Sequence, residues 1–150
     1  MTTTTERLAG TTTSLQHYAL AVIAASLAMQ LVLAACGHAV GILAGVLTAL
    51  IALGYAGFLL RNRDRLGKVR FGLLAAHVVT FAAVVGGYLG HFFLLAVSGN
   101  AAVAAPSAGE DFVMDPGWFG VVVGMPTFWL MGLLAHSLGA ILGRGFEAPR

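Results

Sequence analysis

Charged residues are scarce in this sequence. Asp, Glu, Lys and Arg together make up 9% of the 150 residues, against roughly 25% in an ordinary soluble domain, whereas hydrophobic residues make up 59%. The mean hydropathy is +0.90. A water-soluble globule of this size could not bury so many apolar side chains. The composition therefore excludes an ordinary soluble domain and indicates that lipid covers much of the surface.

Cysteine is nearly absent, and so are the short motifs of common enzyme classes. Cys36 is the one cysteine, so the chain forms no internal disulfide, and no CxxC or Cys/His spacing of a structural zinc site occurs. The sequence also has no Walker motif, no HExxH and no dinucleotide-binding glycine fingerprint. These absences argue against hydrolases and nucleotide-driven functions, and no catalytic residues are predicted for the chain on its own.

Uncharged apolar runs set the number of helices. They cover about 15–60, 71–97 and 117–142, and one helical crossing of a bilayer takes roughly 20 residues. The first run therefore holds two helices, with a turn at Ala35-Cys36-Gly37-His38. The sequence predicts an all-α protein, a four-helix transmembrane bundle. Its expected parts are a disordered N-terminus at 1–14, a transmembrane domain at 15–142 with spans near 15–36, 37–60, 71–97 and 117–142, and a tail at 143–150.

Basic residues occur on only one side of this predicted topology. They precede the first span, join the second to the third, and follow the fourth: Arg7, Arg61, Arg63, Arg65, Lys68, Arg70, Arg144 and Arg150. The opposite connection carries only the acidic residues Glu110, Asp111 and Asp115. Because cytoplasmic loops are enriched in Lys and Arg, both termini are expected in the cytoplasm of a cell-membrane protein. The basic loop also suits anionic lipids or a partner protein, whereas the lack of interleaved aromatic residues argues against nucleic acid.

An alternative interpretation of the N-terminus stays open. Leu33-Ala34-Ala35-Cys36 is similar to a lipoprotein cleavage site, and cleavage would leave three spans and a lipidated Cys36. It would also remove His17. The sequence after Cys36 is apolar again at once, where a lipoprotein begins with a polar tether, so we favour four spans.

Small residues four apart predict close contacts between the spans. The pairs are Gly41 and Gly45, Gly120 and Gly124, and Gly139 and Gly143. They suit a tight bundle in lipid, and they also suit a slot for a flat cofactor. Pro126 is expected to kink the fourth span near its middle, and Trp118 is expected to anchor its start at the membrane interface.

Histidines are the most informative polar residues. No Asp, Glu, Lys or Arg lies inside a predicted span, but all five histidines lie in spans or at their edges: His17, His38, His77, His91 and His136. A polar ring in hydrocarbon is costly unless it is paired, so such residues are candidates for function. Counting along the helices places His17, His77 and His136 in the cytoplasmic half, and His38 and His91 in the outer half.

His77 and His91 lie fourteen residues apart in one span, which corresponds to about 21 Å along a helix and an angular offset of about 40°. One helix face could therefore carry two cofactors, one above the other. Bis-histidine haem sites need two neutral imidazoles on facing helices at matched depth. We expect His77 with His136 as the primary pair, with His17 as another partner at that depth, and His91 with His38 as the secondary pair. Haem b is the expected cofactor, and copper or zinc at His77 and His136 stays open.

Several short segments resemble a known family. Gly37-His38, Leu53-Gly54-Tyr55, Gly87-Tyr88-Leu89-Gly90-His91 and Leu134-Ala135-His136-Ser137-Leu138 are similar to segments of the small four-helix membrane proteins associated with haem-copper oxidase assembly, over about 37–140. This resemblance implies a role in maturing or accompanying a respiratory oxidase, with His38, His91 and His136 as matched positions. The spacing of His77 and His91 is also similar to that of dihaem b-type membrane cytochromes, which implies electron transport.

Three functions follow in order of preference. The first is a redox-associated membrane protein, either a haem-binding electron-transfer subunit or an accessory factor of a terminal oxidase, with a respiratory oxidase or another membrane complex as partner. The second is a non-catalytic structural subunit whose histidines tie helices together. The third is a small transporter or proton path through His77, Ser137 and His136.

Overall fold

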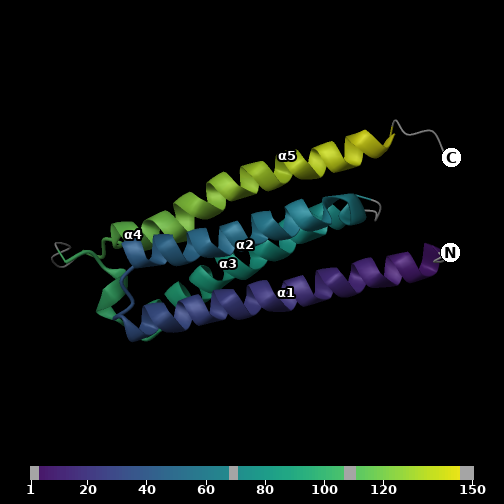
Figure 1. Ribbon diagram of the computed structural model, residues 1–150. Coiled ribbons are helices and arrows are strands. Elements are labelled where there is room, and N and C mark those ends of the chain that lie inside the picture. The colour runs from purple at the N-terminus through teal and green to yellow at the C-terminus, as the bar shows by residue number, and fades with distance from the viewer. Residues whose placement is uncertain (1–3, 68–70, 107–110, 146–150) are drawn as a thin grey trace.

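The computed structural model describes residues 4–67, 71–106 and 111–145, which are helical apart from turns and one isolated bridge. Helix α1 spans Thr4–Ala35, α2 spans Ile42–Leu66 and α3 spans Gly72–Val97. A short 3-10 turn η1 (Ala101–Val103) follows. The last helical segment comprises α4 (Pro116–Phe119), the π-helical turn η2 (Gly120–Gly124) and α5 (Met125–Gly145). The long helices run side by side (Figure 1).

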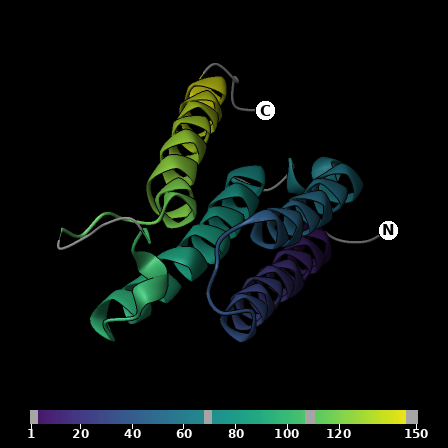
Figure 2. The same cartoon turned by 90° about the vertical axis from the view of Figure 1, so that its left-hand side faces the viewer.

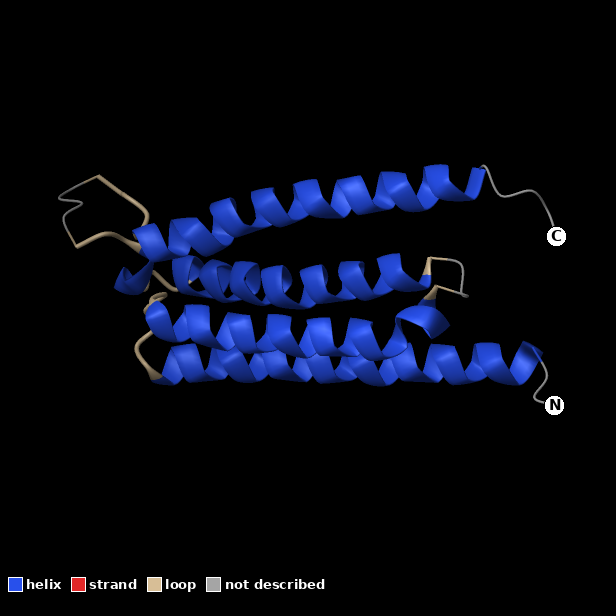
Figure 3. Cartoon of the chain, turned by 45° about the horizontal axis from the view of Figure 1, so that its top comes forward, coloured by secondary structure: helices blue, strands red, loops and turns tan. Residues whose placement is uncertain are grey.

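Four helices in the described ranges are long and apolar enough to cross a membrane: Thr13–Ala35, Ile42–Leu66, Gly72–Val97 and Pro116–Leu142. This confirms the prediction of an all-α chain with four membrane-length helices, and it is compatible with a multi-pass membrane protein. The start of α1 and the end of α5 lie at the same end of the bundle, called the terminal end here (Figure 3). The opposite end, called the loop end, holds the α1–α2 turn and the connection from α3 to α4.

The helix bounds differ from the expected spans at three main places, one of which is the start of α2 at Ile42, five residues after the expected 37. Helix α1 begins at Thr4, inside the stretch 1–14 that we predicted to be disordered. Threonine costs only about 0.5 kcal/mol per residue in a helix, so a helix nucleated by the apolar sequence extends through it. Helix α2 extends to Leu66, six residues beyond the expected 60, because its last turn carries Arg63 and Arg65, which interact favourably with the helix C-terminus. Residues 1–3, 68–70, 107–110 and 146–150 lie outside the described residues, and with them Lys68, Arg70, Glu110 and most of the expected tail.

The turn between α1 and α2 lies where the sequence predicts it. Gly37 and His38 both adopt left-handed backbone conformations, with φ of 83° and 65°. The His38 amide donates to the Leu33 carbonyl at 2.8 Å, which closes the helix in the manner of a Schellman motif. Two successive residues with positive φ cannot continue a right-handed helix, so α1 ends here and the chain turns back along the bundle. Glycine tolerates positive φ readily, whereas histidine adopts it only occasionally.

The fourth span is irregular just before Pro126. The π-helical turn η2 occupies Gly120–Gly124, one turn earlier than the proline that we expected to kink the helix. Proline lacks the amide hydrogen that would bond to the carbonyl four residues back, and a π-helical turn is one way to accommodate that loss. The segment starts sharply because Asp115 Oδ1 accepts hydrogen bonds from the amides of Gly117 and Trp118, with Pro116 at the first helical position.

The packed core is concentrated toward the loop end. Its larger cluster of buried residues comprises Met29, Leu33, Ala44, Val84, Tyr88, Leu95, Val103 and Trp118. A smaller cluster nearer the terminal end comprises Tyr18, Val22 and Ala76. Trp118 is 0% exposed, so the prediction that it anchors the helix at the membrane interface is wrong. Its large apolar ring fills the space between α3 and the loop-end turns, where burial is more favourable than an interfacial position.

Helices α2 and α5 are the least buried. No described side chain of α5 is buried, and Phe128 is 75% exposed. Helix α5 lies on the outside of the bundle next to α3 (Figure 2). Apolar side chains can remain on such a surface only if hydrocarbon covers them, which agrees with the membrane-length helices.

Close helix contact depends on a glycine other than the predicted pairs. A Cβ atom added at Gly41, Gly45, Gly120, Gly124 or Gly139 would meet no atom within 4 Å. A Cβ atom at Gly87 of α3 would lie 2.7 Å from Ser26 Oγ and 3.3 Å from Gln30 Nε2 of α1. Ser26 is buried and donates to the Ala83 carbonyl at 2.6 Å, so it cannot move away without losing that bond. Gly87 therefore sets the approach of α1 to α3.

The Gly87→Ala substitution tests this contact. We expect it to lower the free energy of unfolding by about 1–3 kcal/mol, because the methyl group overlaps Ser26 Oγ. The measurement is unfolding in detergent micelles followed by circular dichroism. Gly86→Ala is the matched control on the same helix, since its Cβ would meet nothing within 4 Å, and it should change stability by less than about 1 kcal/mol. Equal effects of the two substitutions would contradict the proposed close contact.

Candidate functional site

The histidines form two groups at different depths of the bundle. His77 of α3 and His136 of α5 lie toward the terminal end, with ring centres 4.8 Å apart and planes inclined by 33°. His91 of α3 and His38 of the α1–α2 turn lie at the loop end, with ring centres 5.2 Å apart. The structure thus brings together the two pairs that depth matching predicts.

His77 and His136 are held in the same tautomer by their own helices. His77 Nδ1 lies 2.8 Å from the Leu73 carbonyl, and His136 Nδ1 lies 2.8 Å from the Gly132 carbonyl. A carbonyl only accepts, so Nδ1 donates in both rings, and each neutral imidazole keeps a lone pair on Nε2. Metal-binding histidines are commonly oriented in this way, with the second ring nitrogen donating to a backbone carbonyl.

The two rings share a groove between α3 and α5. It has a volume of about 480 Å³, and its lining residues are Leu73, Leu74, His77, Ala135, His136, Gly139 and Ala140. On the α5 side of the groove, the lining residues other than His136 are small: Ala135, Gly139 and Ala140. The two imidazoles are therefore the main polar groups in the groove. Gly139, which the sequence suggested for a tight contact or a flat slot, lines this groove and has no neighbour within 4 Å of an added Cβ. The groove leaves room beside the two imidazoles for a bound group.

Tyr55 of α2 adds a third ring to this group. Its ring meets His77 edge-on, with the centres 5.4 Å apart. The Tyr55 hydroxyl is buried, and no hydrogen-bond partner for it occurs among the described residues. A buried hydroxyl without a hydrogen-bond partner lowers the free energy of unfolding, so the burial of Tyr55 beside His77 is energetically unfavourable.

The loop-end histidines are bonded to each other. His38 Nδ1 lies 2.9 Å from His91 Nε2, and His91 Nδ1 lies 2.8 Å from Gln30 Oε1 of α1. Because the amide oxygen only accepts, His91 Nδ1 donates to Gln30, and His91 Nε2 accepts from His38 Nδ1. The Trp118 ring packs edge-on against His91 at 5.3 Å. This chain of hydrogen bonds joins α1, the α1–α2 turn and α3.

Sequence reasoning did not find Gln30, Tyr55 or Trp118 as members of these groups. Gln30 lies six residues before Cys36 in an apolar run, and an uncharged polar residue there is a signal that could have been used. Tyr55 and Trp118 look like ordinary aromatic residues of a span. Only their positions on neighbouring helices place them next to histidines.

His17 does not join either pair. It is exposed and lines a groove between α1 and α2, whereas His77 and His136 belong to α3 and α5. No ring contact or hydrogen bond involves His17 among the described residues. It therefore offers no second ligand beside His77 in this structure.

The geometry can be compared with that of metal–imidazole complexes. With metal–nitrogen bonds of about 2 Å, two rings at a tetrahedral angle have centres about 5 Å apart, and two rings on opposite faces of a haem iron have centres about 6 Å apart. The 4.8 Å separation of the His77 and His136 ring centres is close to the first value and shorter than the second. His38 and His91 point nitrogens at each other 2.9 Å apart, which leaves no space for an iron between them.

The ligands of a metal ion would not all come from this chain. Among the described residues, no group of three or more His, Cys, Asp or Glu is arranged to hold an ion. Two histidines would therefore need further ligands, such as a porphyrin, water or a partner residue. The exposed Cys36 lies in the turn at the loop end, away from His77 and His136.

The Gln30→Leu substitution tests the loop-end chain. It removes the acceptor of the His91 Nδ1 hydrogen and leaves a buried donor unpaired, so we expect the free energy of unfolding to fall by about 1–2 kcal/mol. Gln16→Leu is the matched control, because Gln16 is exposed on the same helix. Both variants would be unfolded in detergent. A loss no larger for Gln30→Leu than for Gln16→Leu would show that the hydrogen bond contributes nothing.

Known proteins offer no further guide to these groups of residues. The chain matches no protein-family model, no curated protein and no solved structure.

Proposed function

We propose that this protein is a redox-associated membrane protein that binds a transition-metal centre through His77 and His136. The observation that carries the proposal is a pair of neighbouring imidazoles in the same tautomer, since both rings donate from Nδ1 to their own helices, their centres are 4.8 Å apart and both residues line one groove. Each neutral ring keeps a lone pair on Nε2, and two such rings in an apolar groove can share a Lewis acid. Imidazole suits copper, zinc and iron ions.

The centre is either a metal ion held in a tetrahedral arrangement or a haem iron. The ring separation supports the ion as the two helices stand. Haem b stays a candidate because α5 has no buried side chain to resist a small outward movement, and because Gly139 and Ala140 leave an open face beside His136. A bound iron or copper would supply one-electron chemistry, whereas zinc would not, and the chain's own residues would position the metal. The Tyr55 ring packs edge-on against His77 and would help to hold that ligand in place.

In the proposed topology the terminal end faces the cytoplasm. Every Lys and Arg belongs to segments at this end in the sequence, and the connection at the loop end has only acidic charges. The metal centre would then lie in the cytoplasmic half of a cell membrane. The resemblance to proteins of haem-copper oxidase assembly supports a respiratory oxidase or a related membrane complex as partner.

A structural role is the second candidate, and the loop-end group supports it. There His38 bonds to His91 and His91 bonds to Gln30 Oε1, which ties α1, the turn and α3 together without a cofactor. Under this hypothesis His77 and His136 would likewise only hold α5 against α3. The two hypotheses differ in whether purified protein binds a metal through these two rings.

Metal analysis and optical spectroscopy of the purified protein test the proposal. We expect bound haem or copper in material as isolated, and otherwise binding of added Co²⁺ with the absorption of a tetrahedral site. His77→Ala and His136→Ala should each weaken binding at least tenfold, since each removes one of two protein ligands. Tyr55→Phe, which keeps the ring against His77, should leave metal binding unchanged.

The control is His17→Ala, which removes an exposed histidine of α1 outside the pair. It should bind metal as the unaltered protein does. If all three histidine variants bind equally, or if unaltered protein binds neither haem, copper nor Co²⁺, the metal proposal is wrong. Normal unfolding stability of His77→Ala together with lost binding would in addition exclude a purely structural role for that ring.

A further inference from the structure

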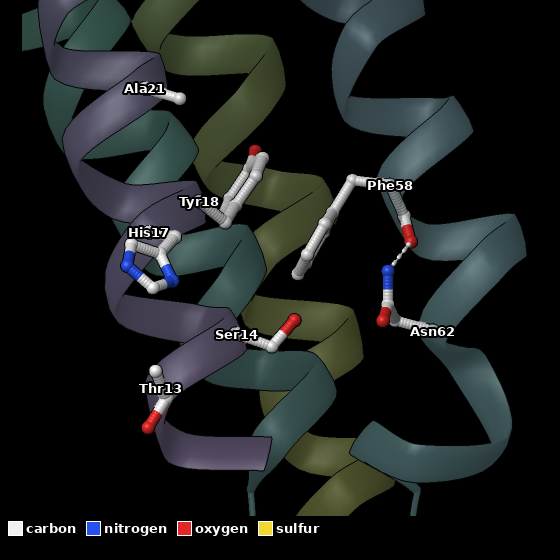
Figure 4. Close-up of a pocket in the computed structure, with 7 residues that line it drawn as sticks. All are labelled: Thr13, Ser14, His17, Tyr18, Ala21, Phe58 and Asn62. Carbon is white, nitrogen blue, oxygen red and sulfur yellow. Dashed lines mark hydrogen bonds between the residues drawn. The ribbon is translucent and has the colours of Figure 1, made fainter. Parts of the chain in front are cut away.

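A second groove lies at the terminal end between α1 and α2. It has a volume of about 550 Å³ and is lined by Thr13, Ser14, His17, Tyr18, Ala21, Phe58 and Asn62. In Figure 4, Ser14 and Tyr18 project from α1 toward α2, and Phe58 projects back toward α1. The groove is separate from His77 and His136, which line a groove between α3 and α5.

The groove changes from apolar to polar toward the end of the bundle. Its apolar part is formed by Ala21 and by the stacked rings of Tyr18 and Phe58, whose centres are 4.0 Å apart. The Tyr18 hydroxyl is bonded to Thr80 of α3, which holds this ring in place. About one turn closer to the end lie Ser14 and Asn62, whose amide nitrogen donates to the Phe58 carbonyl at 2.9 Å. The amide oxygen of Asn62 is thereby oriented away from that carbonyl.

Two arginines continue this gradient. Arg61 and Arg65 follow Phe58 by three and seven residues, so they share its side of α2 within about 60°. Both are exposed, and no acidic partner for either occurs among the described residues. Arg63 lies about 140° around the helix from Phe58, and its Nε is 3.9 Å from the Asp64 carboxylate. The groove side of α2 thus ends in two unneutralised positive charges.

We propose that this groove binds an anionic phospholipid. An acyl chain would lie against Tyr18, Ala21 and Phe58, the ester region would meet Ser14 and Asn62, and the phosphate would lie between Arg61 and Arg65. Along α2 the apolar Phe58 is followed toward the terminal end by Arg61 and Asn62 at nearly the same level and then by Arg65, so the apolar groups lie deeper in the bundle than the polar and cationic groups, as in a lipid. Basic pockets between membrane helices are typical of anionic lipid sites. A free phosphate would use the arginines but not the aromatic wall.

This site is independent of the metal proposal, since it shares no residue with it. It places anionic lipid at the end of the bundle that the charge distribution assigns to the cytoplasm. A lipid held there would fill the groove between α1 and α2. It would also join the two helices in a region where the core has few buried residues.

Native mass spectrometry of the full chain in detergent tests the site, with phosphatidylglycerol and phosphatidylcholine of identical acyl chains as probes. We expect one phosphatidylglycerol to bind at least fivefold more tightly than phosphatidylcholine. Arg61→Gln and Arg65→Gln should each weaken phosphatidylglycerol binding about fivefold. Arg63→Gln is the matched control with the same change of charge, and it should leave binding within about twofold of the unaltered protein.

A second variant tests the aromatic part of the groove without altering charge. Ala21→Trp should fill the apolar part and weaken binding of phosphatidylglycerol, while thermal unfolding checks that the variant is folded. If Arg63→Gln weakens binding as much as Arg61→Gln, or if folded Ala21→Trp binds normally, the groove is not a lipid site. Competition by inorganic phosphate at equal concentration would likewise overturn the proposal. Metal binding by the same variants should be unchanged, which separates this test from that of His77 and His136.

Discussion

The need to satisfy polar rings in an apolar bundle governs the arrangement of this protein. Lipid offers no hydrogen bonds, so every imidazole inside the bundle must bond to protein or to something bound by protein. The chain meets this need in two ways. At the loop end His38, His91 and Gln30 bond to one another. Toward the terminal end His77 and His136 each bond to the carbonyl four residues before, and one nitrogen of each ring stays unused.

This difference separates the chemistry of the two groups, although each pair includes one histidine of α3. The loop-end pair is closed, because its facing nitrogens already hold a hydrogen between them and Trp118 covers one side of His91. The other pair is open, because both residues line a groove and their Nε2 atoms have no side-chain partner among the described residues. An ion or cofactor could enter the second pair without breaking a hydrogen bond between side chains. We therefore place the metal proposal there alone.

The sequence was sufficient for the number and placement of the helices, since their evidence is local. Charge-free runs of membrane length, and glycine with a polar residue at Gly37 and His38, decide where helices lie and where the first pair turns. Counting 1.5 Å per residue also matched His77 with His136 and His91 with His38, because depth in a bundle of parallel axes depends only on position along each helix. That counting says nothing about rotation around the axis or about the distance between helices.

The features that sequence reasoning missed all depend on rotation and distance. Gly41, Gly45, Gly120 and Gly124 have the spacing of a contact motif, yet the close approach is at Gly87, where Ser26 and Gln30 of α1 happen to face α3. Trp118 has the neighbours of an interfacial anchor, yet it fills the core beside His91. Gln30 becomes a partner of His91 only because α1 and α3 pack closely. Such contacts are properties of pairs of helices, and no single stretch of sequence contains them.

The weak packing of α5 connects the fold to the proposed function. Its terminal half contributes no buried side chain, and small residues face α3 around His136. A ligand that joined His77 to His136 would add a bond between α3 and α5 where apolar packing supplies little, so binding and helix association would be thermodynamically linked. Ligand binding would then contribute the free energy of association between α3 and α5 that tighter packing would otherwise provide. The small residues Ala135, Gly139 and Ala140 leave a groove that lowers the stability of the unliganded chain. A bound group between α3 and α5 would explain why these positions carry small side chains.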